Sequence, residues 1–75
     1  MFVVANDKAL SGWGGVSRSL VVIECETSDD IDKATAWLSA RPEMSRVRLN
    51  LNLPKTRKGD HVSLWTRASH PHVFK

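Results

Sequence analysis

The fold is decided by Arg46-Val47-Arg48-Leu49-Asn50-Leu51, in which polar and apolar residues alternate without interruption. A period of two is typical of a β-strand with one buried face. The same period recurs over residues 61–67, where Val62, Leu64 and Thr66 share one face. These two segments predict two strands whose apolar faces turn towards a common core, where a helix covers the sheet.

Two further strands and one helix are predicted in the first half of the chain. Residues 2–5 and 19–26 are apolar at their centres, as expected for buried strands. The sequence Thr27-Ser28-Asp29-Asp30 indicates a helix start, because a hydroxyl can cap the first amides and acidic side chains suit the positive helix end. The helix would end before Pro42. Its sheet-facing stripe would consist of Ile31, Ala34, Thr35 and Leu38, with Trp37 covering the edge of the core.

The element order is ββαββ, which predicts an α+β fold with a four-stranded, mostly antiparallel sheet and one helix packed on one face. Residues 1–75 would form a single small domain. A domain of this size buries roughly 60% of its unfolded surface, so association into a homo-oligomer would stabilise it. The tail, residues 69–75, is too short for regular structure, although Phe74 is expected to dock on the core.

Charge is distributed unevenly along the chain. Residues 1–40 carry three basic and six acidic side chains, whereas residues 41–75 carry eight basic and two acidic ones. A positive second half indicates an anionic partner. The single cysteine, Cys25, excludes an internal disulfide, and there is no signal-peptide pattern and no apolar run long enough to span a bilayer. We therefore expect a cytoplasmic protein that does not enter membranes.

The long connection at residues 5–15 is the first candidate binding site. It contains three glycines, which allow close approach of a ligand to the backbone, and a tryptophan ring. Asn6 and Lys8 precede them and would supply an amide and a cation. Together they predict a pocket for a planar anion, the alternative being that Trp13 only closes one end of the core. The candidate residues of this connection are Asn6, Lys8, Ser11, Gly12, Trp13 and Gly14.

A second candidate site is the sheet face opposite the helix. Alternation would place Arg46, Arg48, Trp65 and Arg67 there, and arginine with tryptophan suits phosphate and base recognition. The alternatives are a solvated outer face or a contact with a second subunit. Glu43, in the connection before this strand, would accept from a base edge or from Lys8, or would pair with Arg41 or Arg46 at the surface.

Catalytic and metal sites are not indicated. Cys25 lies in an apolar strand context typical of a packed, inert thiol. The histidines, His61, His70 and His72, lack a carboxylate or cysteine at ligand spacing. The glycine-rich segment lacks the lysine and hydroxyl residue of a P-loop. We expect binding without turnover, and no cofactor or metal.

Two motifs resemble a family of small tailed-phage proteins, some of which are similar to phage anti-CBASS proteins that sequester cyclic oligonucleotide signals of bacterial immunity. The motifs are Ala5-Asn6-Asp7-Lys8 with Ser11-Gly12-Trp13-Gly14, and residues 40–48, Ala-Arg-Pro-Glu-Met-Ser-Arg-Val-Arg. Together they comprise 17 of the 75 residues. The ending His70-Pro71-His72-Val73-Phe74 departs from the aromatic-rich ending of the family, which leaves the role of Trp65 open.

The resemblance implies a non-hydrolysing sponge for a cyclic di- or trinucleotide, acting in the cytoplasm of the infected bacterial host. Trp13 would stack on a base, while Lys8, Arg46 and Arg48 would neutralise phosphates. Two alternatives stay open, namely an inhibitor that binds a host protein and a binder of single-stranded nucleic acid. The residues expected to read base edges or ribose hydroxyls are Asn6, Ser11 and Glu43.

Overall fold

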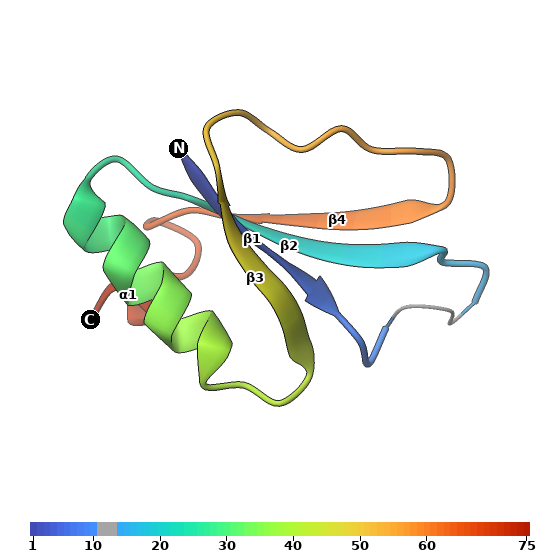
Figure 1. Cartoon of the computed structure of the whole chain (residues 1–75), viewed down its shortest axis with the longest axis horizontal. Coiled ribbons are helices and arrows are strands. Elements are labelled where there is room, and N and C mark those ends of the chain that lie inside the picture. Colours follow the sequence, from blue (N-terminus) through green and yellow to red (C-terminus); the bar gives the residue numbers. More distant parts are fainter. Residues whose placement is uncertain (11–13) are drawn as a thin grey trace.

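Two antiparallel strands, β1 (Phe2–Asp7) and β2 (Arg18–Glu24), form the centre of the sheet (Figure 1). The computed structural model describes residues 1–10 and 14–75. Strand β3 (Met44–Asn50) pairs antiparallel with β1, and β4 (Asp60–Trp65) pairs parallel with β2, giving the order β3-β1-β2-β4. The predicted α+β fold with a mostly antiparallel sheet and one helix is confirmed.

The two central strands are buried on both faces. Val3, Val4 and Ala5 have no exposed surface, and residues 20–23 of β2 are at most 3% exposed. A strand with a neighbour on each side and cover on both faces has no solvent-facing position, which explains the absence of polar residues at these centres.

Helix α1 (Ser28–Ser39) begins where the sequence predicts it. The Thr27 side chain accepts a hydrogen bond of 3.1 Å from the backbone N–H of Asp30 and so caps the first turn. Ala34 and Leu38 are fully buried against the sheet, with Trp37 packed beside them. The prediction for Thr35 is wrong, because this side chain is exposed.

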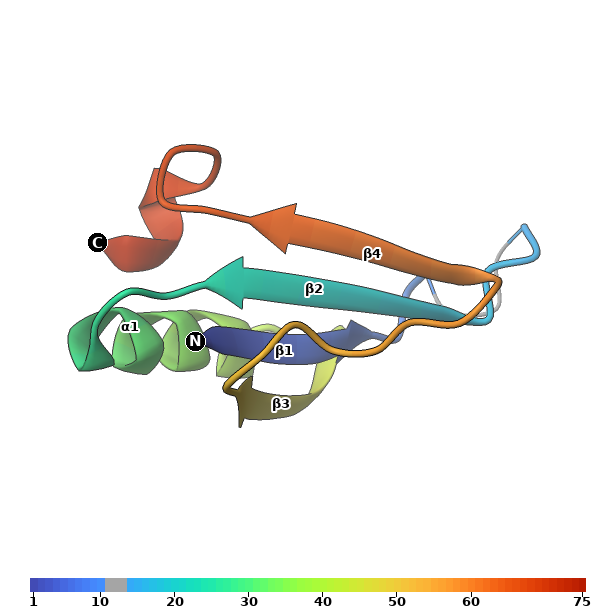
Figure 2. The same ribbon diagram turned by 90° about the horizontal axis from the view of Figure 1, so that it is seen from above.

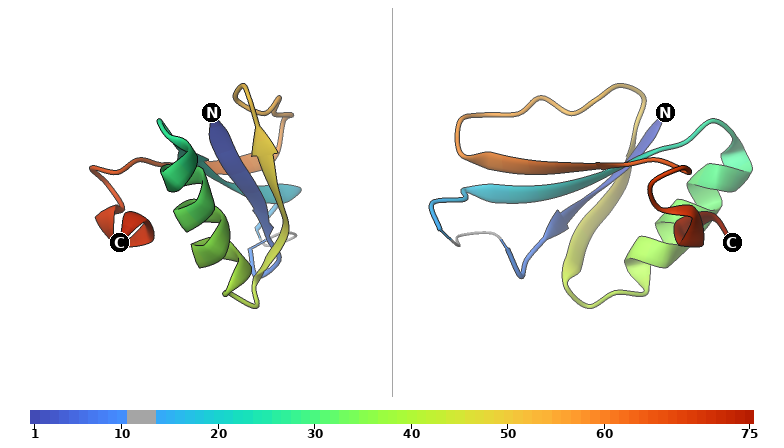
Figure 3. Two further views of the ribbon diagram at one scale, coloured as in Figure 1. Left: turned by 60° about the vertical axis from the view of Figure 1, so that its left-hand side comes forward. Right: turned by 180° about the vertical axis from the view of Figure 1, so that it is seen from behind.

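The C-terminal segment forms a short 3₁₀ helix, η1 (Pro71–Phe74), where no regular structure was expected. Figure 3 shows α1 and this segment on the same side of the sheet. Val73 is 2% and Phe74 4% exposed, so the predicted docking of Phe74 is confirmed. Proline at the start of η1 fixes a helical φ and lets this short turn form.

A β-bulge interrupts the pairing of β1 with β3. Val4 lies opposite Arg48, and Asn6 lies opposite Ser45. Between these two pairs β1 supplies one residue and β3 supplies residues 46 and 47, so β3 carries one extra residue.

The bulge changes which residues of β3 face the core. Met44 and Val47 are three positions apart, yet both pack against it. Strict alternation is therefore broken between these two residues. The prediction that Leu49 and Leu51 are buried is also wrong, although Leu49 lies opposite the core residue Val3, because β3 is the edge strand of the sheet. Leu49 is 50% exposed, and Leu51 lies beyond β3 and is 72% exposed.

Strand β4 presents the opposite face from the one predicted. Trp65 packs against the helix-side core, whereas Val62 and Leu64 are 40% and 50% exposed on the other face. Both faces of β4 carry apolar side chains, Trp65 on one and Val62 with Leu64 on the other. The larger indole of Trp65 buries more apolar surface than Val62 or Leu64 would. The predicted face that combined Trp65 with Arg46 and Arg48 therefore does not exist.

The connection between β3 and β4, residues 51–59, covers part of the face that turns away from α1. Figure 1 shows this connection running along one side of the sheet. Figure 2, seen from above, shows it passing over β1 and the beginning of β2. Leu20, Val22 and Val4 on this face have no exposed surface. In the described part of the chain no helix is long and apolar enough to cross a membrane.

Candidate anion-binding site

The end of β1 and the start of β3 bring several predicted site residues together. Arg48 donates from Nη1 to Oδ1 of Asn6 at 3.0 Å, although 42 positions separate them. Ser45 Oγ also lies 3.4 Å from the carbonyl oxygen of Asn6. The antiparallel register of β1 with β3 explains the contact between Ser45 and Asn6, because these two residues are direct cross-strand partners.

The first connection and the α1–β3 connection meet beside these residues. The backbone N–H of Lys8 donates to the carbonyl oxygen of Glu43 at 2.8 Å. The Glu43 carboxylate instead accepts from Arg41 at 3.0 Å. Two of the predicted partners of Glu43 therefore contact it: Arg41 binds its carboxylate, and Lys8 binds its backbone carbonyl oxygen. The Glu43 pKa lies below its usual value because its own backbone N–H and Arg41 stabilise the carboxylate.

Arg46 occupies a strained position in the bulge. Its φ is +54°, in the left-handed region that an arginine rarely adopts. Bulges with a left-handed first residue normally carry glycine there, and they often re-aim side chains next to functional sites. Its side chain is exposed, and its carbonyl oxygen accepts a hydrogen bond from Arg48.

Three arginines form what we call the cation cluster: Arg18, Arg46 and Arg48. The pKa of Arg48 lies below its usual value, first because the guanidinium is partly buried and then because Arg46 and Arg18 repel its charge. In the described residues neither Arg46 nor Arg48 forms an ion pair with a carboxylate, whereas Arg18 pairs with Asp60. The cluster therefore has a local excess of positive charge.

Arg18 is the member that sequence reasoning missed. It begins β2 and pairs with Asp60 of β4, its Nη2 lying 2.5 Å and its Nε 3.2 Å from the two carboxylate oxygens. The predicted strand began at residue 19, so Arg18 was placed in the connection. The parallel pairing of β2 with β4, which sets Arg18 opposite Asp60, places it at this end of the sheet.

The glycine-rich part of the site is only partly described. Gly14 and Gly15 are exposed and have left-handed backbones, with φ of +56° and +85°. A side chain at either position would be strained, so glycine is required there. The remaining predicted residues of this connection, Ser11, Gly12 and Trp13, lie outside the described residues.

Trp65 and Arg67 belong to a different part of the molecule. Trp65 contacts Trp37 edge to face at 5.5 Å and stacks on His70 at 4.2 Å. Arg67 pairs with Asp30 at the start of α1 and lies over the Phe74 ring at 4.6 Å. The prediction that Trp65 and Arg67 share a sheet face with Arg46 and Arg48 is wrong, because both side chains contact residues around the C-terminal segment.

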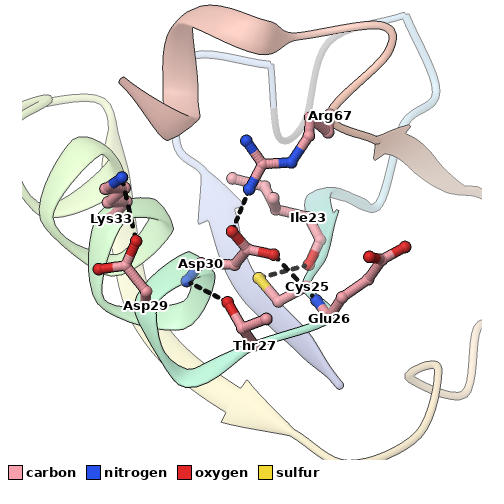
Figure 4. Close-up of polar contacts among 8 residues, drawn as sticks. All are labelled: Ile23, Cys25, Glu26, Thr27, Asp29, Asp30, Lys33 and Arg67. Atoms are coloured by element: carbon pink, nitrogen blue, oxygen red, sulfur yellow. Dashed lines mark hydrogen bonds and ion pairs between the residues drawn. The ribbon is translucent and has the colours of Figure 1, made fainter.

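A pocket of about 400 Å³ lies at that end of the sheet, away from the cation cluster. Asp30 lines this pocket, and Figure 4 shows its carboxylate bonded to Arg67 and to the backbone N–H of Glu26. Burial raises the Asp30 pKa, but these bonds and the Arg67 charge outweigh it and leave the pKa below its usual value. With Asp30 ionised the pocket does not suit an anion. Its lining residues are Glu24, Glu26, Asp30, Thr66, Arg67 and Ala68.

Cys25 follows β2 and is 3% exposed, as expected for a packed thiol. Its pKa is raised, mainly by burial and then by the nearby Asp30 charge. Its Sγ lies 3.6 Å from the Ile23 carbonyl oxygen (Figure 4). A thiol with a raised pKa is a poor nucleophile. Within residues 1–10 and 14–75 no three histidine, cysteine or acidic side chains are grouped so that they could hold a metal ion.

Comparison with known proteins assigns no family: no family model, no curated protein and no solved structure matches the chain.

Proposed function

We propose that this protein binds and sequesters a cyclic di- or trinucleotide without hydrolysing it, in the cytoplasm of a phage-infected bacterium. The carrying observation is the cation cluster beside Asn6, in which Arg48 is partly buried among like charges. Phosphate groups would relieve this repulsion and accept charge-assisted hydrogen bonds from guanidinium groups. The phage setting and the cyclic ligand come from the resemblance in the first loop and residues 40–48.

The surroundings of the cluster supply the other groups that a nucleotide needs. The Asn6 side chain can read a base edge or a ribose hydroxyl, and its amide nitrogen is not used in the bond to Arg48. Gly14 and Gly15, in the same connection as Lys8, have no side chains, so a ligand can approach their backbone closely. Trp13 as a base-stacking ring stays a prediction, which a Trp13→Ala variant tests directly.

The decisive experiment is a calorimetric titration of cyclic di- and trinucleotides against wild type, Arg48→Met and Lys33→Met. Lys33 is the matched control, because it loses the same charge from α1, where it pairs with Asp29 at 3.0 Å. A charged hydrogen bond contributes about 1.5–3 kcal/mol, so Arg48→Met should bind about 10- to 100-fold more weakly while Lys33→Met binds normally.

Recovery of the ligand separates a sponge from an enzyme. Heating the complex should release the cyclic nucleotide unchanged, as measured by mass spectrometry. A cleaved product would make the protein a hydrolase, and an absence of binding across the whole panel would refute the proposed function.

A host-protein inhibitor is the second candidate, favoured by the connection between β3 and β4. Leu51 and Leu53 are 72% and 58% exposed there, next to the cationic residues Lys55, Arg57 and Lys58. Exposed leucines flanked by charge are typical of a protein-binding surface. A stoichiometric host protein captured from lysate, lost in a Leu51→Ser variant and with no nucleotide bound, would favour this function. Binding of single-stranded nucleic acid is less favoured, because it required Trp65 on one face with Arg46 and Arg48, and Trp65 packs against the core instead.

A further inference from the structure

The two edges of the sheet differ in whether another strand can pair with them. Strand β3 is interrupted by the bulge and carries Arg46 and Arg48. Bulges and charged side chains are devices that prevent edge-to-edge pairing. A second β3 would also place like charges opposite one another.

Strand β4 lacks these devices. It has six residues without proline or glycine, and its pairing with β2 is regular from Arg18–Asp60 to Ile23–Trp65. Its single charged residue, Asp60, has a carboxylate only 2% exposed and neutralised by Arg18. Among residues 1–10 and 14–75 no strand pairs with the outer edge of β4, and this edge carries no charge to repel an identical strand.

We propose that the protein forms a two-fold symmetric dimer in which β4 pairs antiparallel with β4 of a second copy. The side chains fix the register. When Ser63 lies on the two-fold axis, Val62 of each copy faces Leu64 of the other, on the sheet face where both are half-exposed. Those four apolar side chains then lose solvent contact together, and the two sheets become one eight-stranded sheet.

The small size of the chain adds a reason for a second copy as the occupant. One copy buries a limited core, and extension of the sheet buries further apolar surface without a new fold. A strand paired about a two-fold axis needs no other partner, because the symmetry makes the contact of Val62 with Leu64 twice. This dimer requires no nucleotide, so its failure and the failure of the proposed function are separable.

Cysteine cross-linking tests the register. In the proposed dimer the two Ser63 Cα atoms lie about 5 Å apart, which suits a disulfide. The two His61 Cα atoms lie about 14 Å apart along the strand, too far for one. Oxidised Ser63→Cys should therefore run as a covalent dimer, whereas His61→Cys, although more exposed, should not. The native Cys25 is buried and gives a low background.

Light scattering with size-exclusion chromatography tests the interface itself, without added ligand. Wild type should elute as a dimer, and Leu64→Arg should weaken association by about tenfold or more. Leu51→Arg adds the same charge at an equally apolar, exposed position outside β4 and should leave the dimer intact. Circular dichroism verifies that each variant is folded.

Two results would overturn the dimer. One is a wild-type protein that stays monomeric across a wide range of concentration. The other is cross-linking of His61→Cys as fast as Ser63→Cys, which would place the contact elsewhere.

Discussion

Arg48 and Asn6 are joined by a hydrogen bond of 3.0 Å between Nη1 and Oδ1, across the β1–β3 pair and next to the bulge. Arg48 also donates to the carbonyl oxygen of Arg46 at 2.7 Å, so its guanidinium is held on the strand rather than extended into solvent. A cation fixed in this way among other cations is prepared to meet an anion, since less side-chain entropy is lost on binding.

Asn6→Asp should raise stability and weaken ligand binding together. The new carboxylate would lie against Arg48 and neutralise part of the cation cluster, which we expect to add up to about 1 kcal/mol to the free energy of unfolding. The same charge would repel phosphate and lower affinity about tenfold or more. Denaturant unfolding and calorimetric titration measure the two effects.

Asn50→Asp is the control for that change, because Asn50 pairs with Phe2 at the other end of β3. It introduces the same charge and should leave affinity close to wild type. Equal loss of affinity in both variants would show that net charge, not the cluster, attracts the ligand.

Arg46→Gly should stabilise the fold at the expense of binding. A left-handed backbone costs a non-glycine residue about 1–2 kcal/mol, of which the flexibility of glycine in the unfolded chain returns part. We expect a net gain of about 1 kcal/mol, which raises Tm by about 4–8 °C in a domain of this size. Arg46→Ala removes the same guanidinium but keeps the strain. A Tm for Arg46→Gly at or below that of Arg46→Ala would contradict the left-handed assignment.

The sequence predicted the elements well because their signals are local. The Thr27 cap and the apolar centres of β1 and β2 each act within a few residues. The bulge could not be predicted, because Met44 and Val47 point the same way only when paired with β1. The facing of β4 also depended on a distant contact, namely Trp37 against Trp65.

The candidate site was predicted in the same uneven way. Asn6 and Arg48 were both expected among the ligand-binding residues, but the pairing of β1 with β3 that joins them was not predicted. Arg67 was assigned to the wrong face because its partner, Asp30, lies 37 positions away on the helix. Ion pairs between distant residues leave no periodic signal in the sequence. A side chain that is positioned by such a pair, as Arg67 is, therefore cannot be placed from the sequence alone.

Asp60→Asn should make stability less dependent on pH. The Asp60 pKa lies below the ordinary 3.8, first because Arg18 hydrogen-bonds the carboxylate and then because the Arg57 N–H donates to it at 2.9 Å. A carboxylate with a lowered folded pKa stabilises the fold above its unfolded pKa, and this contribution is lost as pH falls through the folded pKa. Wild type should therefore have the higher Tm at neutral pH, with the two proteins converging below pH 3.8.

Asp29→Asn provides the comparison for this pH series. Asp29 is 72% exposed, pairs with Lys33 on the surface of α1 and lies in the first turn of the helix, so its replacement should lower Tm less than that of Asp60. A gap between wild type and Asp60→Asn that persists in acid would indicate that the amide disturbs packing instead of removing a charge interaction.

Trp65→Ala should lower stability without affecting ligand binding. The indole packs on the core, meets Trp37 at 5.5 Å and stacks on His70, so we expect a loss of about 2 kcal/mol. Trp65→Phe keeps a ring and should lose about half as much. Thermal unfolding gives the stability and calorimetry the affinity. A Trp65→Phe variant that folds normally but no longer binds nucleotide would return Trp65 to the ligand site.

Phe74→Ala should destabilise the fold more than any surface change near the C-terminus. Phe74 is 4% exposed, and Arg67, which is anchored by Asp30, covers its ring at 4.6 Å. Removal of a buried aromatic side chain costs about 3 kcal/mol, a large share of the stability of a small domain. Lys75→Ala alters the adjacent, exposed residue and should have no measurable effect. Denaturant midpoints compare the two, and a Phe74→Ala midpoint equal to wild type would mean that η1 does not close the core in solution.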